Sequence, residues 1–221
     1  MSAADASEAQ EIIRWSLEKY GDAIMTTGLN LSGTVLLHIA SEAGFSGKLV
    51  FVDTGFHFPE TLRFWQDLKA RYSRISFVKL KPGIETGSLF ETDPTRCCQL
   101  NKIAPLEDYL ASTKPSALIN ARTRESAQGR FGLQVFEEGD PAHINPLVSF
   151  TRQDLENFAK ANGLEVHPLY ASGFLSMGCW PCTKAVRPGD SQRSGRFTGQ
   201  GRTECGLWGT LGSPQAQRTD R

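Results

Sequence analysis

The chain has 221 residues, of which 39% are hydrophobic, and its 24 basic residues equal its 24 acidic residues in number. This hydrophobic content excludes an intrinsically disordered chain, and the charge balance excludes a global field that would attract nucleic acid or an anionic membrane. The length suits one domain, with or without a tail.

The first ten residues, MSAADASEAQ, lack the basic and apolar regions of a signal peptide. The apolar runs are also too short to span a membrane. Five cysteines, an odd number, in such a chain indicate cytosolic thiols or metal ligands rather than disulfides. We therefore expect a soluble cytoplasmic protein.

Short β-prone stretches alternate with helical patterns along the chain. Strands are expected at 23–27, 48–53, 75–80 and 117–120, and helices at 7–20, 31–43 and 60–72, with a further helix from the capping-box-like stretch 149–154 to about 162. This alternation is typical of βαβ units on a parallel sheet, so the expected fold class is α/β. Ligands then bind at the carboxyl ends of strands, beside loops 26–32 and 53–58.

Gly28–Thr34 reads GLNLSGT, which is close to a Walker A loop, but Thr34 stands where that loop needs lysine. This excludes a P-loop NTPase. Two interpretations remain. The stretch is either a plain turn or a strand-to-helix turn where backbone N–H groups, with Thr26, Thr27 and Ser32, hold one phosphate.

Asp53 ends a predicted strand in the sequence VDTGFHFPET. Its carboxylate either caps the following turn or contacts a nucleotide, and we favour the nucleotide. No GxGxxG sequence follows any predicted strand, which argues against a nicotinamide enzyme.

The cysteines fall into two pairs and one remainder. Cys97 and Cys98 are adjacent, Cys179 and Cys182 form a CxxC pair, and Cys205 stands alone. Four thiolates complete one Fe–S or zinc site, which leaves a separate reactive thiol. Zinc suits the adjacent pair less well, because neighbouring side chains diverge, and four buried apolar thiols are the third interpretation.

The C-terminal stretch is rich in glycine and basic. From residue 184 onward, seven basic residues stand against three acidic ones, and seven glycines fall between 188 and 213. This composition predicts a flexible arm, residues 188–221, on a domain of residues 1–187. The local excess of positive charge suits a small anionic ligand better than a long polymer.

Eight stretches, in a fixed order, carry a family resemblance. They are MTTGLNLSGTVLLHIA, VFVDTGFHFPET, CCQLNKIAPL, ARTRESAQGR, NPL at 145–147, GCWPCT, RSGR at 193–196 and TECGLW. Together they resemble the assimilatory sulfonucleotide reductases (APS/PAPS reductases), and most of all the iron–sulfur adenylyl-sulfate (APS) reductases. The order of CC, CxxCT and ECGL is the specific part of this resemblance.

The resemblance implies a Rossmann-like fold of the adenine-nucleotide α-hydrolase type and one 4Fe-4S cluster per chain, held by Cys97, Cys98, Cys179 and Cys182. It makes Cys205 the nucleophile. It places Lys102 near the cluster and the substrate sulfate, and it assigns anion binding to Arg124, Arg130, Arg193 and Arg196. Three features depart from the usual motifs: Asn101 stands where arginine is usual, Trp208 stands where histidine is usual, and the middle motif reads ARTRES where a glycine and paired arginines are usual.

The implied reaction is reduction of adenosine 5′-phosphosulfate (APS) to sulfite and AMP through an S-sulfocysteine, in sulfate assimilation. No cysteine is left over to release the sulfite, so an external dithiol is needed, namely thioredoxin or glutaredoxin. Relatives that use the 3′-phosphorylated substrate (PAPS) lack both cluster pairs. The alternatives are a PAPS or dual reductase, a tRNA sulfur-transferase relative, and a non-enzymatic Fe–S or zinc protein. Neither nucleic acid nor membrane is an expected partner, and homo-oligomerisation is left open.

Overall fold

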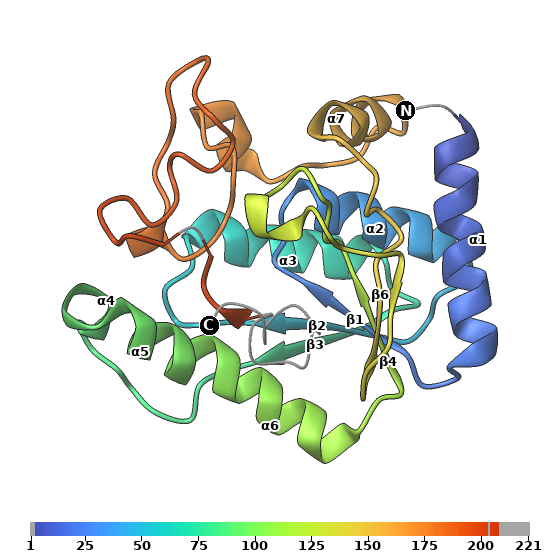
Figure 1. The fold of residues 1–221 in the computed structure, drawn as a ribbon, viewed down its shortest axis with the longest axis horizontal. Coiled ribbons are helices and arrows are strands. Elements are labelled where there is room, and N and C mark those ends of the chain that lie inside the picture. The colour runs from blue at the N-terminus through green and yellow to red at the C-terminus, as the bar shows by residue number, and fades with distance from the viewer. Residues whose placement is uncertain (1–2, 203, 208–221) are drawn as a thin grey trace.

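The computed structural model describes residues 3–202 and 204–207, and these form a fold around a six-stranded sheet of order β3-β2-β1-β4-β6-β5 (Figure 1). The strands are β1 (Ile24–Thr27), β2 (Lys48–Val52), β3 (Ser76–Leu80), β4 (Ala117–Asn120), β5 (Phe136–Glu137) and β6 (Ala142–Ile144). All neighbours run parallel except β5, which pairs antiparallel with β6. The predicted α/β class and its four strands are confirmed, whereas β5 and β6 were not predicted.

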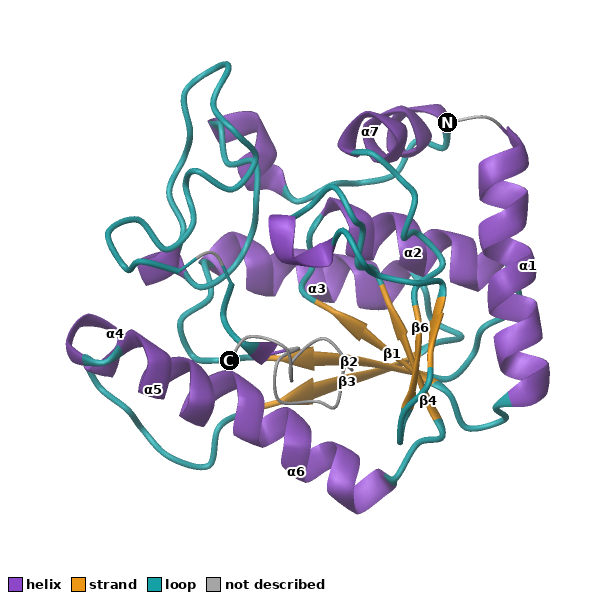
Figure 2. Ribbon diagram, viewed as in Figure 1, coloured by secondary structure: helices purple, strands orange, loops and turns teal. Residues whose placement is uncertain are grey.

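Helices cover both faces of the sheet (Figure 2). They are α1 (Ala3–Lys19), α2 (Leu31–Glu42), α3 (Pro59–Arg71), α4 (Leu89–Thr92), α5 (Pro94–Cys98), α6 (Ala104–Thr113) and α7 (Arg152–Ala161). Helices α1, α2, α3 and α7 lie over one face, and α6 lies over the other. None of the described helices is long and apolar enough to cross a membrane.

The central strands are buried on both faces, as parallel strands usually are. Because side chains alternate along a strand, Met25 and Leu49 enter the larger core under α2, whereas Ile24 and Val50 enter the smaller core under α6. This two-sided burial explains why these strands are apolar runs rather than alternating ones. It also holds their carboxyl ends at one edge, in register.

The segment from α5 to α6 is one interrupted helix that the sequence did not reveal. Between them, Gln99–Ile103 forms a π-helical turn, and Pro105 follows in the first turn of α6. Proline has no N–H to donate to the carbonyl four residues earlier, and its ring crowds that carbonyl, so the helix widens there. The widened turn carries Lys102 and directly follows Cys97 and Cys98.

The chain after α7 returns across the carboxyl edge of the sheet (Figure 1). The capping box predicted for α7 is present, with Thr151 and Asp154 bonded reciprocally. Further on, a single bridge pairs Thr183 with Arg196, and the ring of Phe197 is buried. In the described part of the predicted arm, the stretch around Phe197 is therefore packed on the domain, whereas residues 188–191 are exposed.

Candidate active site

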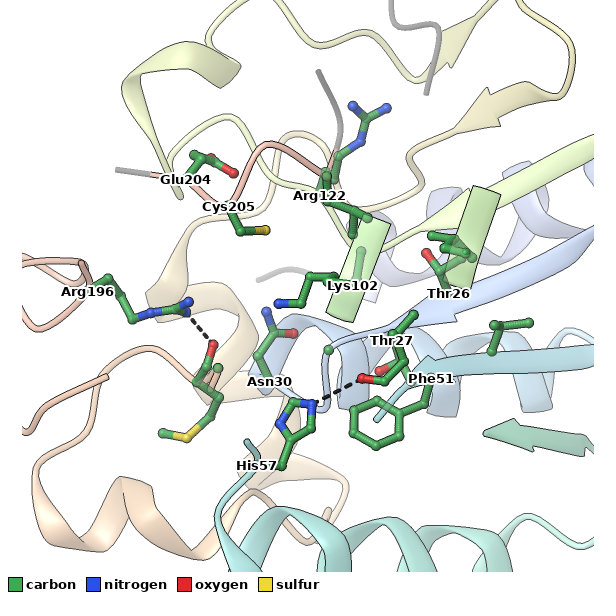
Figure 3. A pocket seen from close by; sticks show the side chains of 18 of the residues that line it. Thr26, Thr27, Asn30, Phe51, His57, Lys102, Arg122, Arg196, Glu204 and Cys205 are labelled. Atoms are coloured by element: carbon green, nitrogen blue, oxygen red, sulfur yellow. Dashed lines mark hydrogen bonds between the residues drawn. The ribbon is translucent and has the colours of Figure 1, made fainter. Parts of the chain in front are cut away.

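A cavity of about 170 Å³ opens at the carboxyl edge of the sheet (Figure 3). Strand ends, the start of α6 and the arm enclose it, and its lining includes Thr26, Thr27, Gly28, Phe51, His57, Lys102, Leu106, Arg122, Arg130, Arg193, Arg196, Glu204 and Cys205. Open α/β sheets bind their ligands at this edge. The cavity is therefore the candidate active site.

The β1–α2 turn forms one wall of this cavity. Its helix start is already capped: the Asn30 side-chain oxygen accepts from the Gly33 N–H at 2.9 Å, and the Leu31 N–H donates to the Tyr170 hydroxyl at 2.7 Å. Two of the N–H groups expected to hold a phosphate thus have protein partners. Thr27 and the adjacent Gly28 face the cavity instead.

Thr26 and Ser32 lie in different places. Thr26 lines the cavity, and its hydroxyl donates to the Asn120 side-chain oxygen at 2.8 Å across two paired strands. Ser32 instead lines a smaller polar cavity of about 70 Å³. Arg130 and Arg193 line both cavities, so the two adjoin.

Two other predicted substrate residues lie outside the lining of the main cavity. Asp53 is 6% exposed, accepts from the Gly55 N–H at 3.2 Å, and pairs with Lys79 at 3.7 Å. It caps its turn, which is the interpretation that we did not favour. Arg124 donates from Nε to the carbonyl of Leu133 at 2.8 Å and so braces its own loop.

Arg196 enters the cavity from the arm (Figure 3). Its guanidinium donates to the carbonyl oxygens of Met177 and, at 3.1 Å, Cys182. A Cβ at Gly178 would overlap this guanidinium, so a larger residue there would displace the Arg196 side chain. Gly178, which precedes Cys179 of the CxxC pair, therefore leaves the space that the Arg196 guanidinium occupies.

Arg130 links the cavity wall to the residue before Cys205. Its guanidinium donates to the Glu204 carboxylate at 2.8 Å and to the Ser126 hydroxyl at 3.0 Å. The fork is thus shared between protein partners and the cavity that it lines.

Cys205 and Lys102 point into the same space (Figure 3). Burial alone would raise the pKa of the Cys205 thiol, but the charge of Lys102, a backbone hydrogen bond at Leu207 and the charge of Arg196 together lower it. The Cys205 thiolate in turn raises the pKa of Lys102, against the effect of burial. Because the thiolate is the nucleophilic form of cysteine, the site is built to activate Cys205.

Arg122 and His57 are among the cavity residues that were not predicted. Arg122 is buried, pairs with the Glu137 carboxylate, and donates to the Asn145 side chain at 3.0 Å. His57 donates from Nε2 to the Val52 carbonyl at 3.1 Å, and burial, helped by Lys102, lowers its pKa to about 4, so the ring is neutral. The buried partners Glu137 and Asn145 lie far along the chain, so no local signal separates Arg122 from the neighbouring arginine.

The two cysteine pairs meet at a third cavity, of about 20 Å³, which we call the cysteine cavity. Its lining is Thr54, Phe56, Phe90, Cys97, Cys98, Asn101, Lys102, Cys179, Pro181 and Cys182. All five cysteines of the chain are free thiols. Among the described residues, no three His, Cys, Asp or Glu side chains already converge as a ready-made metal site. Lys102 lines the cysteine cavity and also the main cavity, so it lies between the thiol pairs and Cys205.

Residues 22–185 match the family described as the phosphoadenosine phosphosulfate reductase domain. The chain belongs to this family. Among its reductase relatives is the adenosine 5′-phosphosulfate reductase of Deinococcus radiodurans, 46% identical, with 91% of this chain and 82% of the relative covered. That of Streptomyces coelicolor is 34% identical, with 91% and 88% covered.

Solved structures agree with this membership. The phosphoadenylyl-sulfate (PAPS) reductase of Candida auris, a phosphate complex, superposes with a TM-score of 0.71 at 25% identity over 81% of this chain and 90% of that one. The FMN adenylyltransferase of Candida glabrata superposes with a TM-score of 0.67 at 15% identity over 85% and 66%. The second likeness shows the fold alone, and it confirms the predicted fold class.

Proposed function

We propose that this protein reduces adenosine 5′-phosphosulfate to sulfite and AMP in sulfate assimilation. The observation that carries the proposal is the convergence of Cys205, Lys102, Arg193 and Arg196 on one cavity at the nucleotide-binding edge of the sheet. A thiolate ringed by cations suits attack on a dianionic phosphosulfate. The curated relatives described above are named for this reaction.

The chemistry needs no hydride. The Cys205 thiolate attacks the sulfate sulfur, an S–S bond forms, and the S–O bond to AMP breaks. An external dithiol then attacks the sulfur of Cys205, which releases sulfite. The dithiol supplies the two electrons and leaves as a disulfide. The other four cysteines face the cysteine cavity, so we propose thioredoxin, or glutaredoxin, as the reductant, in the cytoplasm.

The cationic side chains of the cavity act on the negative charges of the substrate and of the Cys205 thiolate. Arg193 and Arg196 reach the cavity from the arm, and Lys102 reaches it from the widened helix turn. Guanidinium forks match phosphate and sulfate oxygens, while the ammonium lowers the pKa of Cys205. Lys102 and Arg196 thus both attract the anionic substrate and favour the thiolate form of Cys205.

The thiols of Cys97, Cys98, Cys179 and Cys182 would hold a 4Fe-4S cluster, one per chain. The fit rests on their sharing one cavity with apolar walls at Phe56 and Phe90, since an all-sulfur donor set suits Fe–S clusters or zinc. When bound, the cluster would supply charge and structural support beside Lys102. The two electrons of the reaction are accounted for by thiols.

Metal analysis after anaerobic purification tests this site. We expect about four iron and four sulfide per chain, with broad absorption at about 400 nm. Cys98→Ser should lose most of the iron, because a ligand is removed, whereas the matched variant Cys205→Ser should keep it. Zinc in place of iron in the unmutated protein would refute the cluster.

Substrate choice is tested by sulfite release with reduced thioredoxin and either nucleotide. We expect kcat/KM to be at least about tenfold higher for APS than for PAPS. The 3′-phosphate of PAPS would be a charged group without a partner in the site, and such a group costs more than about 1.4 kcal/mol. Both cysteine pairs are present, and the resemblance ties them to APS. Preference for PAPS would establish the alternative, a PAPS or dual reductase.

We further propose that residues 188–221 form an arm distinct from the domain of residues 1–187 and close over the substrate. The flexible segment between Cys182 and Cys205 spans on the order of 25 Å, enough for Cys205 to reach an incoming thioredoxin. Saturating AMP or APS should slow tryptic cleavage between residues 187 and 202 by about tenfold or more. Equal cleavage rates with and without nucleotide would contradict this closure.

A further inference from the structure

Each of the four paired cysteines has a side-chain hydrogen-bond partner of its own. The pairs are Asn101 Nδ2 to Cys97 Sγ at 3.5 Å, Arg202 Nη1 to Cys98 Sγ at 3.6 Å, Thr54 Oγ1 with Cys179 Sγ at 3.2 Å, and Gln200 Nε2 to Cys182 Sγ at 3.7 Å. Two of these partners belong to the body of the domain. The other two, Gln200 and Arg202, belong to the arm and lie just before Cys205 in the chain.

The two arm residues contact different cysteine pairs. Gln200 contacts a thiol of the CxxC pair, and Arg202 contacts a thiol of the adjacent pair. The arm therefore bridges both halves of the cysteine cavity rather than resting on one. Its attachment depends on the two pairs being held together.

Arg202 also determines how Gln200 is oriented. Its Nε and Nη2 donate to the Gln200 side-chain oxygen at 3.0 and 2.8 Å. Arginine can only donate, so this oxygen must face Arg202 and the amide N–H₂ must face Cys182. The amide is thereby aligned as a donor to sulfur.

Arg202 is itself anchored to the domain. Its Nη2 also donates to the Pro94 carbonyl, at 3.2 Å, at the start of α5. Its guanidinium lies 4.7 Å from the centre of the Phe197 ring, which is 3% exposed. The Arg202 side chain is therefore fixed by several contacts, and its hydrogen bond to Cys98 is one of them.

We infer that Gln200 and Arg202 are positioning residues that make the placement of Cys205 depend on the loading of the cysteine cavity. The inference rests on the proposed function, because it takes the four cysteines as cluster ligands. A ligating thiolate carries negative charge and accepts hydrogen bonds more strongly than a protonated thiol. Loading the cavity therefore tightens the arm, and loss of the cluster loosens the segment that carries the nucleophile.

Hydrogen exchange of the arm in the holoenzyme tests the inference. Gln200→Leu and Arg202→Leu should each speed amide exchange in residues 193–202 by roughly tenfold, since a hydrogen bond to a charged group is lost. Arg187→Leu is the matched control, because it removes an exposed arginine just before the arm and should leave exchange unchanged. Exchange in β1 and β2 reports whether each variant is folded.

Two further measurements separate positioning from simple stabilisation. The Fe–S(Cys) stretching bands in the resonance Raman spectrum should shift in Gln200→Leu and Arg202→Leu but not in Arg187→Leu, because hydrogen bonds to cluster sulfurs alter the electronics of the cluster. The cluster-free Cys98→Ser protein should show the same fast arm exchange as Arg202→Leu. Arg202→Lys, which keeps the charge without the fork, should give an intermediate rate.

Unchanged arm exchange in both leucine variants, or full arm protection in the folded cluster-free protein, would overturn the inference. These outcomes can be told apart from a failure of the proposed function. Iron content and sulfite release of the unmutated enzyme test the proposed function, whereas ratios between variants test the role of the arm.

Discussion

Replacing Cys205 with serine is expected to lower sulfite release from APS by at least roughly a thousandfold, because among the described residues that line the cavity Cys205 is the only thiol, and a thiolate is needed to form the covalent intermediate. The serine hydroxyl has a far higher pKa than the thiol and stays protonated beside Lys102. Substrate binding should change little, because the cationic side chains of the cavity are untouched. The measurement is single-turnover sulfite release, with trapping of an enzyme-bound ³⁵S label in the unmutated protein.

The matched control for this substitution is Cys97→Ser, which removes a thiol of the cysteine cavity. It should lose iron and the chromophore, whereas Cys205→Ser should retain both. The pair of variants therefore separates a nucleophile from a ligand. Activity retained in Cys205→Ser would sink the mechanism, and loss of iron in that variant would move Cys205 into the ligand set.

The second large effect is expected at Lys102, which lines both cavities. Lys102→Met keeps the length of the side chain and removes its charge, so sulfite release should fall by roughly a hundredfold or more. The pKa of Cys205 should rise, because the charge of Lys102 is the largest influence that lowers it. The pH midpoint for alkylation of Cys205 by iodoacetamide should accordingly move upward.

The sign of this pH effect is determined by which form reacts. A thiolate is the form that is alkylated, so a higher pKa means slower alkylation at neutral pH and recovery of the rate at higher pH. Arg196, Glu204 and Cys98 also act on Cys205 or lie near it, and the substitution leaves them unchanged. Lys81→Met removes an exposed lysine outside both cavities and should leave the midpoint unchanged. A downward shift in Lys102→Met would contradict this account of how the thiol is activated.

Strands β1 to β4 and helices α1, α2, α3 and α7 could be predicted from the sequence because their signals are local. Buried parallel strands are apolar runs, amphipathic helices repeat every 3.6 residues, and the box at Thr151 and Asp154 marks a helix start. The short strands β5 and β6 lack such a signal. Their positions depend on pairing with β4 and with each other.

The active site was predicted unevenly for the same reason. The pairing of CC with CxxC and the isolation of Cys205 can be read from chain order, and the structure brings each set to its own cavity. The choice among arginines could not be made in this way. Arg122 faces the cavity while Arg124 braces a loop, and the difference is set by a buried carboxylate supplied from another strand.

The sequence by itself therefore determined the α/β class, the division of the cysteines into two pairs and one separate thiol, and the family. These features follow from local periodicity and from the order of residue types along the chain. Only the tertiary structure decided which donors meet which thiols. Thr54 follows β2, Asn101 lies in the widened α5–α6 turn, and Gln200 and Arg202 lie in the returning arm. The donors converge because these three segments meet over one edge of the sheet. Hydrogen bonds of this kind depend on distances across the fold, which no spacing along the chain encodes.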